Sequence, residues 1–227
     1  MTAFFEEQRP SESPFIDKIW YAQSTQPGAF ISLAESHSEI VVSNHNGTIT
    51  VTVRGPETKA TPAMVPAYSE WLGIVFKLGT FVPTLLPRNL IDRRDVNLPV
   101  TSRTLFWLDN TRWEIPTYEN ADTFVEHLVR EELLVFDPVV DEVLEGHSPP
   151  LSPRTLQYRF VRATGLPYKV IQQIERAQRA SVLLQQGSTI ADTTHALGYY
   201  DQSHLTNALR RFLGQTPAQI AHMRQPE

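Results

Sequence analysis

Two stretches in the last third of the chain follow one plan, and this repeat constrains the fold more than any other feature. Residues 151–165 and 197–217 each contain a capping residue, a short amphipathic segment with an arginine-rich end, and then glycine. In the first stretch Ser152 is a favoured N-cap and Pro153 stands at the first helical position. In the second stretch Asp201 is the N-cap. The repeat predicts two short helices, each with a polar outer face.

A long helix is predicted between these two segments. Residues 168–186 carry an uninterrupted helical pattern of apolar residues, and Gly187 ends it as a C′ residue. Such a helix spans roughly 28 Å at about 1.5 Å per residue. Ser188 is then expected to cap a further short helix, and Gly198 provides the tight corner before the second polar helix. Residues 188–212 therefore read as a helix-turn-helix.

The side chains on the polar faces suit the edges of DNA bases. Glutamine and asparagine can pair with adenine, arginine with guanine, and the threonine methyl group can meet thymine. Two such helices on a rod of this length could enter major-groove segments about one turn, ~34 Å, apart. The alternative is that both faces are simply solvated.

The charge distribution favours a nucleic-acid partner for the C-terminal part alone. The 227 residues suit two modest domains and carry a net charge of −5. Residues 1–145 hold 11 basic and 21 acidic side chains, whereas residues 146–227 hold 9 basic and 4 acidic ones. Eight of those nine are arginine, the side chain best suited to phosphates and guanine edges.

The N-terminal half reads as short strands from residue 15 to residue 81. Its clearest element is a hairpin over 39–54, where Asn46-Gly47 supplies the positive φ of a tight turn. The chain has seventeen prolines, and many of them lie between residues 56 and 116, which favours β structure over helices in this half. We expect an α+β chain with an antiparallel β domain at 1–119, a connecting helix at 120–136 and an all-α domain at 137–227. The connecting helix could pair two chains into a homodimer.

Residues 151–221 resemble the DNA-binding domain of the AraC/XylS family of bacterial transcription regulators. The resemblance rests on Leu-Ser-Pro-Arg-Thr-Leu-Gln from residue 151, Glu-Arg-Ala in the long helix, Ile-Ala-Asp from residue 190, Gly-Tyr-x-Asp-Gln-Ser-His-Leu from residue 198, and Gly-Gln-Thr-Pro from residue 214. The N-terminal half resembles, more loosely, the cupin-like sensor domains of this family.

The resemblance implies a role for individual side chains. Base-reading positions fall on Arg154, Gln157 and Tyr158 in the first unit and on Gln202, Ser203, Thr206 and Asn207 in the second. We assign phosphate contacts to Arg159, Arg162, Arg210 and Arg211. Tyr158 and Asn207 stand where relatives often carry arginine, so the base preference cannot be transferred. The first unit is also short, with 138–145 as its only supporting helix.

The resemblance also implies partners and a setting. Double-stranded DNA is the expected partner, with RNA polymerase contact and activation as further implications. An unknown small-molecule effector would bind the N-terminal domain in a pocket lined by aromatic side chains: Trp20, Tyr21, Trp71, Phe76 and Trp107. We expect no cofactor, no membrane contact and a cytoplasmic location, since the chain has no cysteine and no long apolar run.

Two other functions stay open at this point. The N-terminal half could be a cupin-like enzyme or small-molecule binder, with Glu35, His37, Glu39 and His45 as the nearest candidates for metal ligands. Their spacing does not match metal cupins, and no nucleophile or phosphate loop is apparent, so we expect neither a metal site nor catalysis. Alternatively, the helical half could bind proteins, and such binding should not collapse with salt as DNA binding does.

Overall fold

The computed structural model describes residues 4–222, and the chain divides into two compact units. Unit 1 combines the residues up to Ala29 with Ser36–Pro56 and Met64–Pro167. Unit 2 combines Phe30–Glu35, Glu57–Ala63 and the chain from Tyr168 onward.

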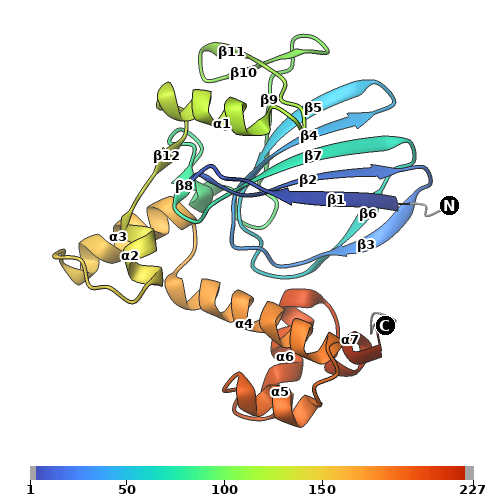
Figure 1. The fold of residues 1–227 in the computed structure, drawn as a ribbon, viewed down its shortest axis with the longest axis vertical. Helices are drawn as coiled ribbons and strands as arrows, with labels where there is room; N and C mark the ends of the chain where they lie inside the picture. Colours follow the sequence, from blue (N-terminus) through green and yellow to red (C-terminus); the bar gives the residue numbers. More distant parts are fainter. Residues whose placement is uncertain (1–3, 223–227) are drawn as a thin grey trace. The chain divides into compact units, whose positions relative to one another are not determined.

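Unit 1 is built on a six-stranded antiparallel sheet in the order β1-β2-β7-β4-β5-β9 (Figure 1). This arrangement confirms the predicted antiparallel β architecture of the N-terminal half. The strands of the sheet are β1 (Phe4–Pro10), β2 (Ile16–Ser24), β4 (Glu39–His45), β5 (Thr48–Arg54), β7 (Ser69–Phe76) and β9 (Val96–Leu98).

The hairpin between β4 and β5 confirms the clearest strand prediction. Asn46 and Gly47 have φ values of 51° and 82°, which is the turn geometry that matches the twist of paired strands. The register pairs Val42 with Val51, and β4 pairs with β7 on its other side. The alternating apolar residues of β5 can therefore enter the core while the threonines between them stay more exposed.

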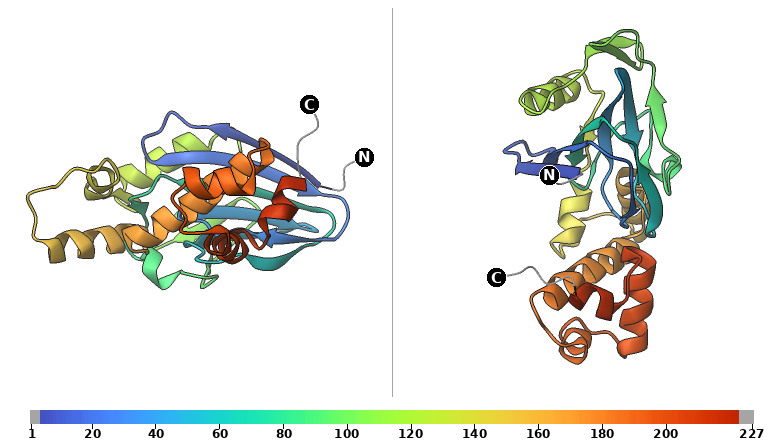
Figure 2. Two further views of the ribbon diagram at one scale, coloured as in Figure 1. Left: turned by 90° about the horizontal axis from the view of Figure 1, so that it is seen from below. Right: turned by 90° about the vertical axis from the view of Figure 1, so that its right-hand side faces the viewer.

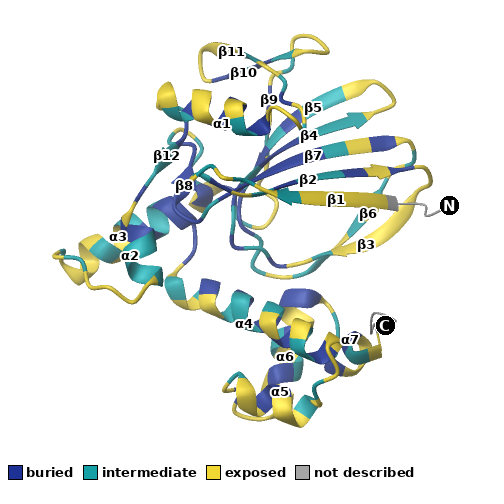
Figure 3. Cartoon of the chain, viewed as in Figure 1, coloured by how far each residue is buried: buried dark blue, intermediate teal, exposed yellow. Residues whose placement is uncertain are grey.

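The core of unit 1 lies between the sheet and α1 (Ala121–Arg130), which covers one face of the sheet (Figure 2, right). Buried residues concentrate along the central strands β2, β4 and β7 (Figure 3). Phe124, Val125 and Leu128 of α1 join this core. The apolar stripe that suggested pairing of two chains is therefore covered by the chain's own sheet.

The helix α1 is shorter than the predicted 120–136 connecting helix. Glu132 adopts a left-handed φ of 58°, and the Leu134 amide turns back to donate to the Leu128 carbonyl at 3.2 Å. Asn120 does not cap the helix through its side chain, because its Oδ1 atom instead accepts from the Thr117 amide at 2.7 Å. The chain then enters the region that carries the first predicted reading helix.

Smaller elements complete unit 1. β8 pairs with β12, which leads directly into α2 and α3, while η1 lies beside α3. Their bounds are β8 (Thr80–Phe81), η1 (Pro87–Asn89), β10 (Leu105–Leu108), β11 (Thr111–Glu114), β12 (Val135–Phe136), α2 (Val139–Leu144) and α3 (Pro153–Thr164).

Unit 2 is a small helical bundle with two segments from the N-terminal half added to it. Its helices are α4 (Tyr168–Gln185), α5 (Ile190–Ala196), α6 (Gln202–Leu213) and α7 (Pro217–His222). β3 (Gly28–Ser32) pairs with β6 (Thr61–Val65), and the division between the units passes through both strands. Ile171, Ile174 and Leu184 of α4 are fully buried, which agrees with the predicted apolar stripe of the long helix.

The compact units do not follow the predicted domain boundary at residue 137. Both α2 and α3 group with the sheet in unit 1, and residues 30–35 and 57–63 group with the C-terminal helices in unit 2. No helix in the described part of the chain has the length and apolar character needed to cross a membrane.

Candidate nucleic-acid interface

The first predicted reading helix, α3, begins and ends as its sequence indicates. The Ser152 hydroxyl accepts from the Thr155 amide at 3.2 Å, and Pro153 follows at the first position. Phe160 and Ala163 are buried against unit 1. Arg154, Gln157 and Tyr158 are exposed, so the three candidate base readers of this helix are free to meet a ligand.

A partly buried ion pair fixes α3 to the start of α2. Arg159 donates to Asp137 through Nε at 3.1 Å and through Nη2 at 2.5 Å, while the Asp137 side chain is only 9% exposed. Asp137 also accepts from the Val139 amide at 3.1 Å. These hydrogen bonds raise the pKa of the Arg159 guanidinium. Its predicted phosphate contact stays a prediction, and its observed role is to position α3.

Arg162 has a partner inside unit 1 as well. Its guanidinium lies 5.4 Å from the centroid of the Phe81 ring, a distance at which a cation is attracted to an aromatic face. Both arginines at the C-terminal end of α3 therefore contact their own chain. A phosphate contact by Arg162 also remains a prediction.

Gly165 is required where α3 ends against η1. Its φ is 78°, and a Cβ placed there would lie 2.9 Å from the Pro87 carbonyl carbon and 3.0 Å from the Arg88 amide nitrogen. We expect Gly165→Ala to destabilise unit 1 by roughly 1–3 kcal/mol. The cost of a left-handed backbone in alanine adds to the cost of the steric overlap between the new Cβ and η1. Urea unfolding monitored by circular dichroism measures this loss. Gly146 has a similar φ of 79°, but the position of its Cβ is open space. Gly146→Ala should therefore lower the unfolding free energy by less.

The second predicted helix-turn-helix consists of α5 and α6. Thr189, and not Ser188, is the N-cap of α5, because its hydroxyl accepts from the Asp192 amide at 3.0 Å. Asp201 caps α6 as predicted, accepting from the His204 amide at 2.7 Å. Gly198, with φ of 65°, forms the corner between the two helices.

The predicted inner and outer faces of α6 are confirmed by burial. Leu205, Leu209 and Phe212 are buried in unit 2. Gln202, Ser203, Asn207, Arg210 and Arg211 are exposed, and Thr206 is partly exposed. The Thr206 hydroxyl donates to the Gln202 carbonyl at 2.8 Å, so its methyl group is the part available for contact with a thymine methyl.

Two segments of the N-terminal half hold the C-terminal end of α6. The Ala34 amide donates to the Phe212 carbonyl, and the Ala60 amide donates to the Arg211 carbonyl, both at 2.8 Å. Gln178 of α4 donates to the Ala34 carbonyl at 3.2 Å. The last carbonyls of a helix have no partner within it, so these amides satisfy groups that would otherwise need water. Nothing in the sequence signalled this anchor.

The five aromatic residues predicted to line an effector pocket are not gathered around one cavity. Trp20 and Tyr21 are neighbours on β2, and successive side chains of a strand point to opposite faces. Phe76 belongs to the core of unit 1, and Trp20 covers Gly73 of the paired strand. Trp71 lies on β7 opposite Ala22, and Trp107 lies near Arg112 in the β10–β11 hairpin. The pocket therefore remains a prediction without a site built around it.

The polar residues considered as metal ligands have structural partners. Glu39 accepts from the Trp20 indole at 3.0 Å and from Arg54 at 3.4 Å. His45 shares a hydrogen bond of 2.7 Å with the Ser69 hydroxyl. Among residues 4–222, no three histidine or acidic side chains are grouped so that they could hold a metal ion.

Comparison with known proteins identifies the C-terminal region. A family described as "Helix-turn-helix domain" matches residues 150–223. This region is therefore a helix-turn-helix domain, as its resemblance to the AraC/XylS type implied.

The chain is also similar to individual known proteins. The chain is 41% identical over 70 residues to the HTH-type transcriptional regulator VirS from two strains of Mycobacterium tuberculosis, CDC 1551 / Oshkosh and H37Rv. The matched segment covers 30% of this chain and 20% of each VirS sequence. Structures of ToxT from Vibrio cholerae align over 99–100% of this chain and 100% of theirs, with TM-scores of 0.38 and 0.40 and identities of 9% and 7%.

Proposed function

We propose that this chain is a transcription regulator that binds double-stranded DNA sequence-specifically through α3 and α6. The observation that carries the proposal is the outer face of α6. Its amide, hydroxyl and arginine side chains point away from a buried apolar stripe on a helix that is capped at its N-terminus and anchored at its C-terminus. Amide and arginine side chains at such positions can distinguish base pairs in the major groove.

Two features favour DNA reading by both α3 and α6 rather than by α6 alone. α3 has the same plan as α6, with a side-chain N-cap, a buried inner face and a left-handed glycine at its end. α4, which follows α3 in the chain, is one continuous helix of 18 residues. The spacing between α3 and α6 on DNA stays a prediction, since the two helices belong to different units.

Selection of DNA ligands by the full chain tests the proposal directly. We expect repeated rounds of binding to a randomised duplex to enrich a motif with two parts separated by about one helical turn. Failure to enrich any motif, together with binding that does not weaken as salt rises, would contradict a DNA-binding function and favour a protein-binding module.

Substitution of single readers tests which side chains specify bases. We expect Arg154→Ala and Gln202→Ala each to weaken binding to the selected duplex by about 1–3 kcal/mol and to relax preference at one position. Thr155→Ala serves as a control on the same exposed turn, although its hydroxyl contacts Ser152. Unchanged preference profiles for both reader variants would remove these residues from the interface.

Several finer points belong to the same proposal. A small-molecule effector in unit 1, contact with RNA polymerase, activation, homodimer formation and a cytoplasmic location all extend the regulator function, and none requires catalysis. Pairing through the apolar stripe of α1 is disfavoured, because Leu128 is fully buried in unit 1. Leu128→Glu would therefore disrupt the core, and light scattering of the unaltered chain is the better measurement of oligomeric state.

A further inference from the structure

Between residues 169 and 179, one face of α4 carries long polar side chains. Lys169, Gln172, Gln173, Arg176 and Arg179 are related by steps of three or four residues, with Gln172 and Gln173 side by side, which places them toward the same side of a helix. Three of the five are cationic, and none is apolar. This face is not used to pack the core of unit 2, because the buried positions of α4 are others: Ile171, Ile174, Ala177, Ala180 and Leu184.

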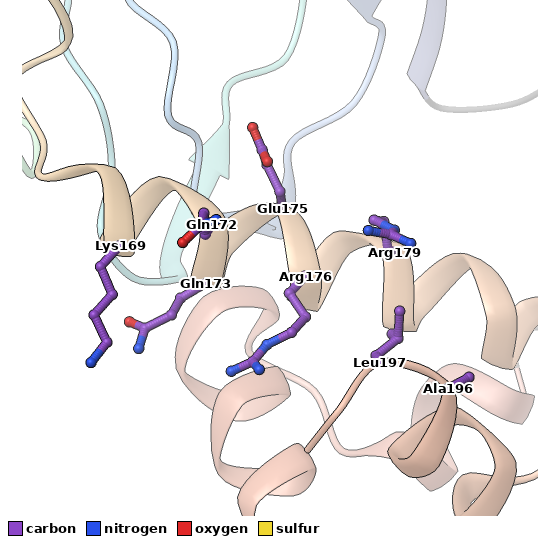
Figure 4. Close-up of a pocket in the computed structure, with 8 residues that line it drawn as sticks. All are labelled: Lys169, Gln172, Gln173, Glu175, Arg176, Arg179, Ala196 and Leu197. Carbon is purple, nitrogen blue, oxygen red and sulfur yellow. The ribbon is translucent and has the colours of Figure 1, made fainter. Parts of the chain in front are cut away.

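The polar face of α4 forms one wall of an open groove of about 410 Å³. The end of α5 contributes Ala196 and Leu197 to the other wall. Figure 4 shows Lys169, Gln173 and Arg176 extending from one side of α4, with Leu197 beneath Arg179. Glu175, the one acidic residue at the groove, extends in the opposite direction in this view. The charges of Lys169 and Arg176 therefore lie on the side away from the carboxylate, whereas Arg179 stands one helical turn after Glu175.

Aromatic contacts connect this groove to the first turn of α6. The Arg176 guanidinium lies 4.3 Å from the centroid of the Tyr199 ring, and the Tyr199 ring lies 5.2 Å from the His204 ring in an edge-on contact. Tyr199 is only 5% exposed, and burial raises the pKa of its hydroxyl, so the ring stays neutral beside the cation. His204 directly follows Gln202 and Ser203, two of the predicted base readers.

We propose that this groove on α4 holds backbone phosphates of the DNA duplex next to the site read by α6. The inference rests on the proposed function. A reading helix that enters the major groove by its N-terminal end brings the flanking phosphates close to the residues around that end. Lysine and arginine form charge-assisted hydrogen bonds with phosphate, and glutamine amides can donate to it. The long helix is then part of the binding surface as well as a spacer.

The salt dependence of binding tests this proposal. We expect Lys169→Gln combined with Arg179→Gln to lower the slope of log K against log salt by about 1.8, since each phosphate contact contributes roughly 0.9. Preference among bases, measured on the selected duplex and on a scrambled one, should stay unchanged. Arg176 is left in place because its contact with Tyr199 makes it part of the folded turn.

A charge-matched control separates local contact from general attraction. Arg94→Gln with Arg103→Gln removes the same charge from exposed positions of unit 1, and the slope should then change little. An unchanged slope for the groove variant, or an equal decrease for the control, overturns the groove proposal while leaving the proposed function intact. A wild-type chain that shows neither base selection nor salt dependence overturns the proposed function itself.

A second measurement does not depend on affinity. The chain has no cysteine, so a single Lys169→Cys substitution can carry an iron chelate that cleaves nearby DNA backbone. We expect cuts at one edge of the selected motif. Gln185→Cys lies on an exposed position at the opposite end of α4, away from the residues that line the groove, so it should cut much less. Equal cleavage from both positions, or none from Cys at position 169 on a bound duplex, would place the groove away from DNA.

Discussion

Replacing Asp137 by alanine is expected to destabilise unit 1 by roughly 2–4 kcal/mol, because the substitution removes a buried carboxylate that accepts three hydrogen bonds. The loss has two parts. Arg159 is left without its partner, and the first turn of α2 loses the acceptor for the Val139 amide. Since Arg159 lies on α3, selective DNA binding should weaken along with stability. Urea unfolding and binding to the selected duplex measure the two effects.

Asp141→Ala provides the matched control for this prediction. Asp141 pairs with Lys77 at 2.9 Å, but both side chains are substantially exposed, and exposed ion pairs contribute about 0–1 kcal/mol. In the double variant Asp137→Ala/Arg159→Ala, the two losses should be less than additive, as expected for residues in direct contact. Equal unfolding free energies for the Asp137 and Asp141 variants would show that the Asp137–Arg159 pair does not hold α3.

Proline at positions 34 and 60 should release the C-terminal end of α6. Proline has no amide hydrogen, so Ala34→Pro and Ala60→Pro remove the donors to the Phe212 and Arg211 carbonyls. Leaving such acceptors without partners costs about 1–3 kcal/mol each, and we expect the double variant to lose roughly 2–5 kcal/mol of stability. Thermal unfolding of the full chain checks this value.

The glycine double variant at the same positions keeps both amide hydrogens and isolates the loss of the donors. Glycine within ordered backbone costs about 0.5–1 kcal/mol per site, so this control should remain the more stable one. DNA affinity gives the second readout, because a loosened α6 presents its readers less rigidly. A proline variant as stable as the glycine control would mean that the two hydrogen bonds contribute little.

Local features of the sequence predicted most of the helices and turns. Caps and left-handed glycines act over three or four residues, so Ser152, Asp201 and the Asn46-Gly47 turn could be identified directly. Adjacent candidates are harder to separate. Ser188 and Thr189 are both good caps, and Thr189 prevails because its hydroxyl also donates to the Asp192 carboxylate at 2.7 Å.

Contacts between distant residues could not be predicted in this way. Asp137 and Arg159 are 22 residues apart, and the Ala34 amide meets a carbonyl of α6 across most of the chain. The periodic pattern of apolar residues in the sequence does not indicate which distant residues will pair. The effector pocket stays a prediction, because aromatic composition alone does not indicate which face of a strand a ring occupies. The polar face of α4 could not be assigned a role from the sequence, because the helical repeat of apolar residues identifies only the buried side of the helix.

The division of the chain into two interleaved units determines when each unit can fold during synthesis. The polypeptide passes between the two units at five places, after residues 29, 35, 56, 63 and 167. Residues 30–35 leave the ribosome well before α6 does. Unit 2 can therefore close only after α6 has been made, and pairings between such remote segments form slowly. A nascent chain that stops before residue 213 would carry both early segments with their helical partner still missing.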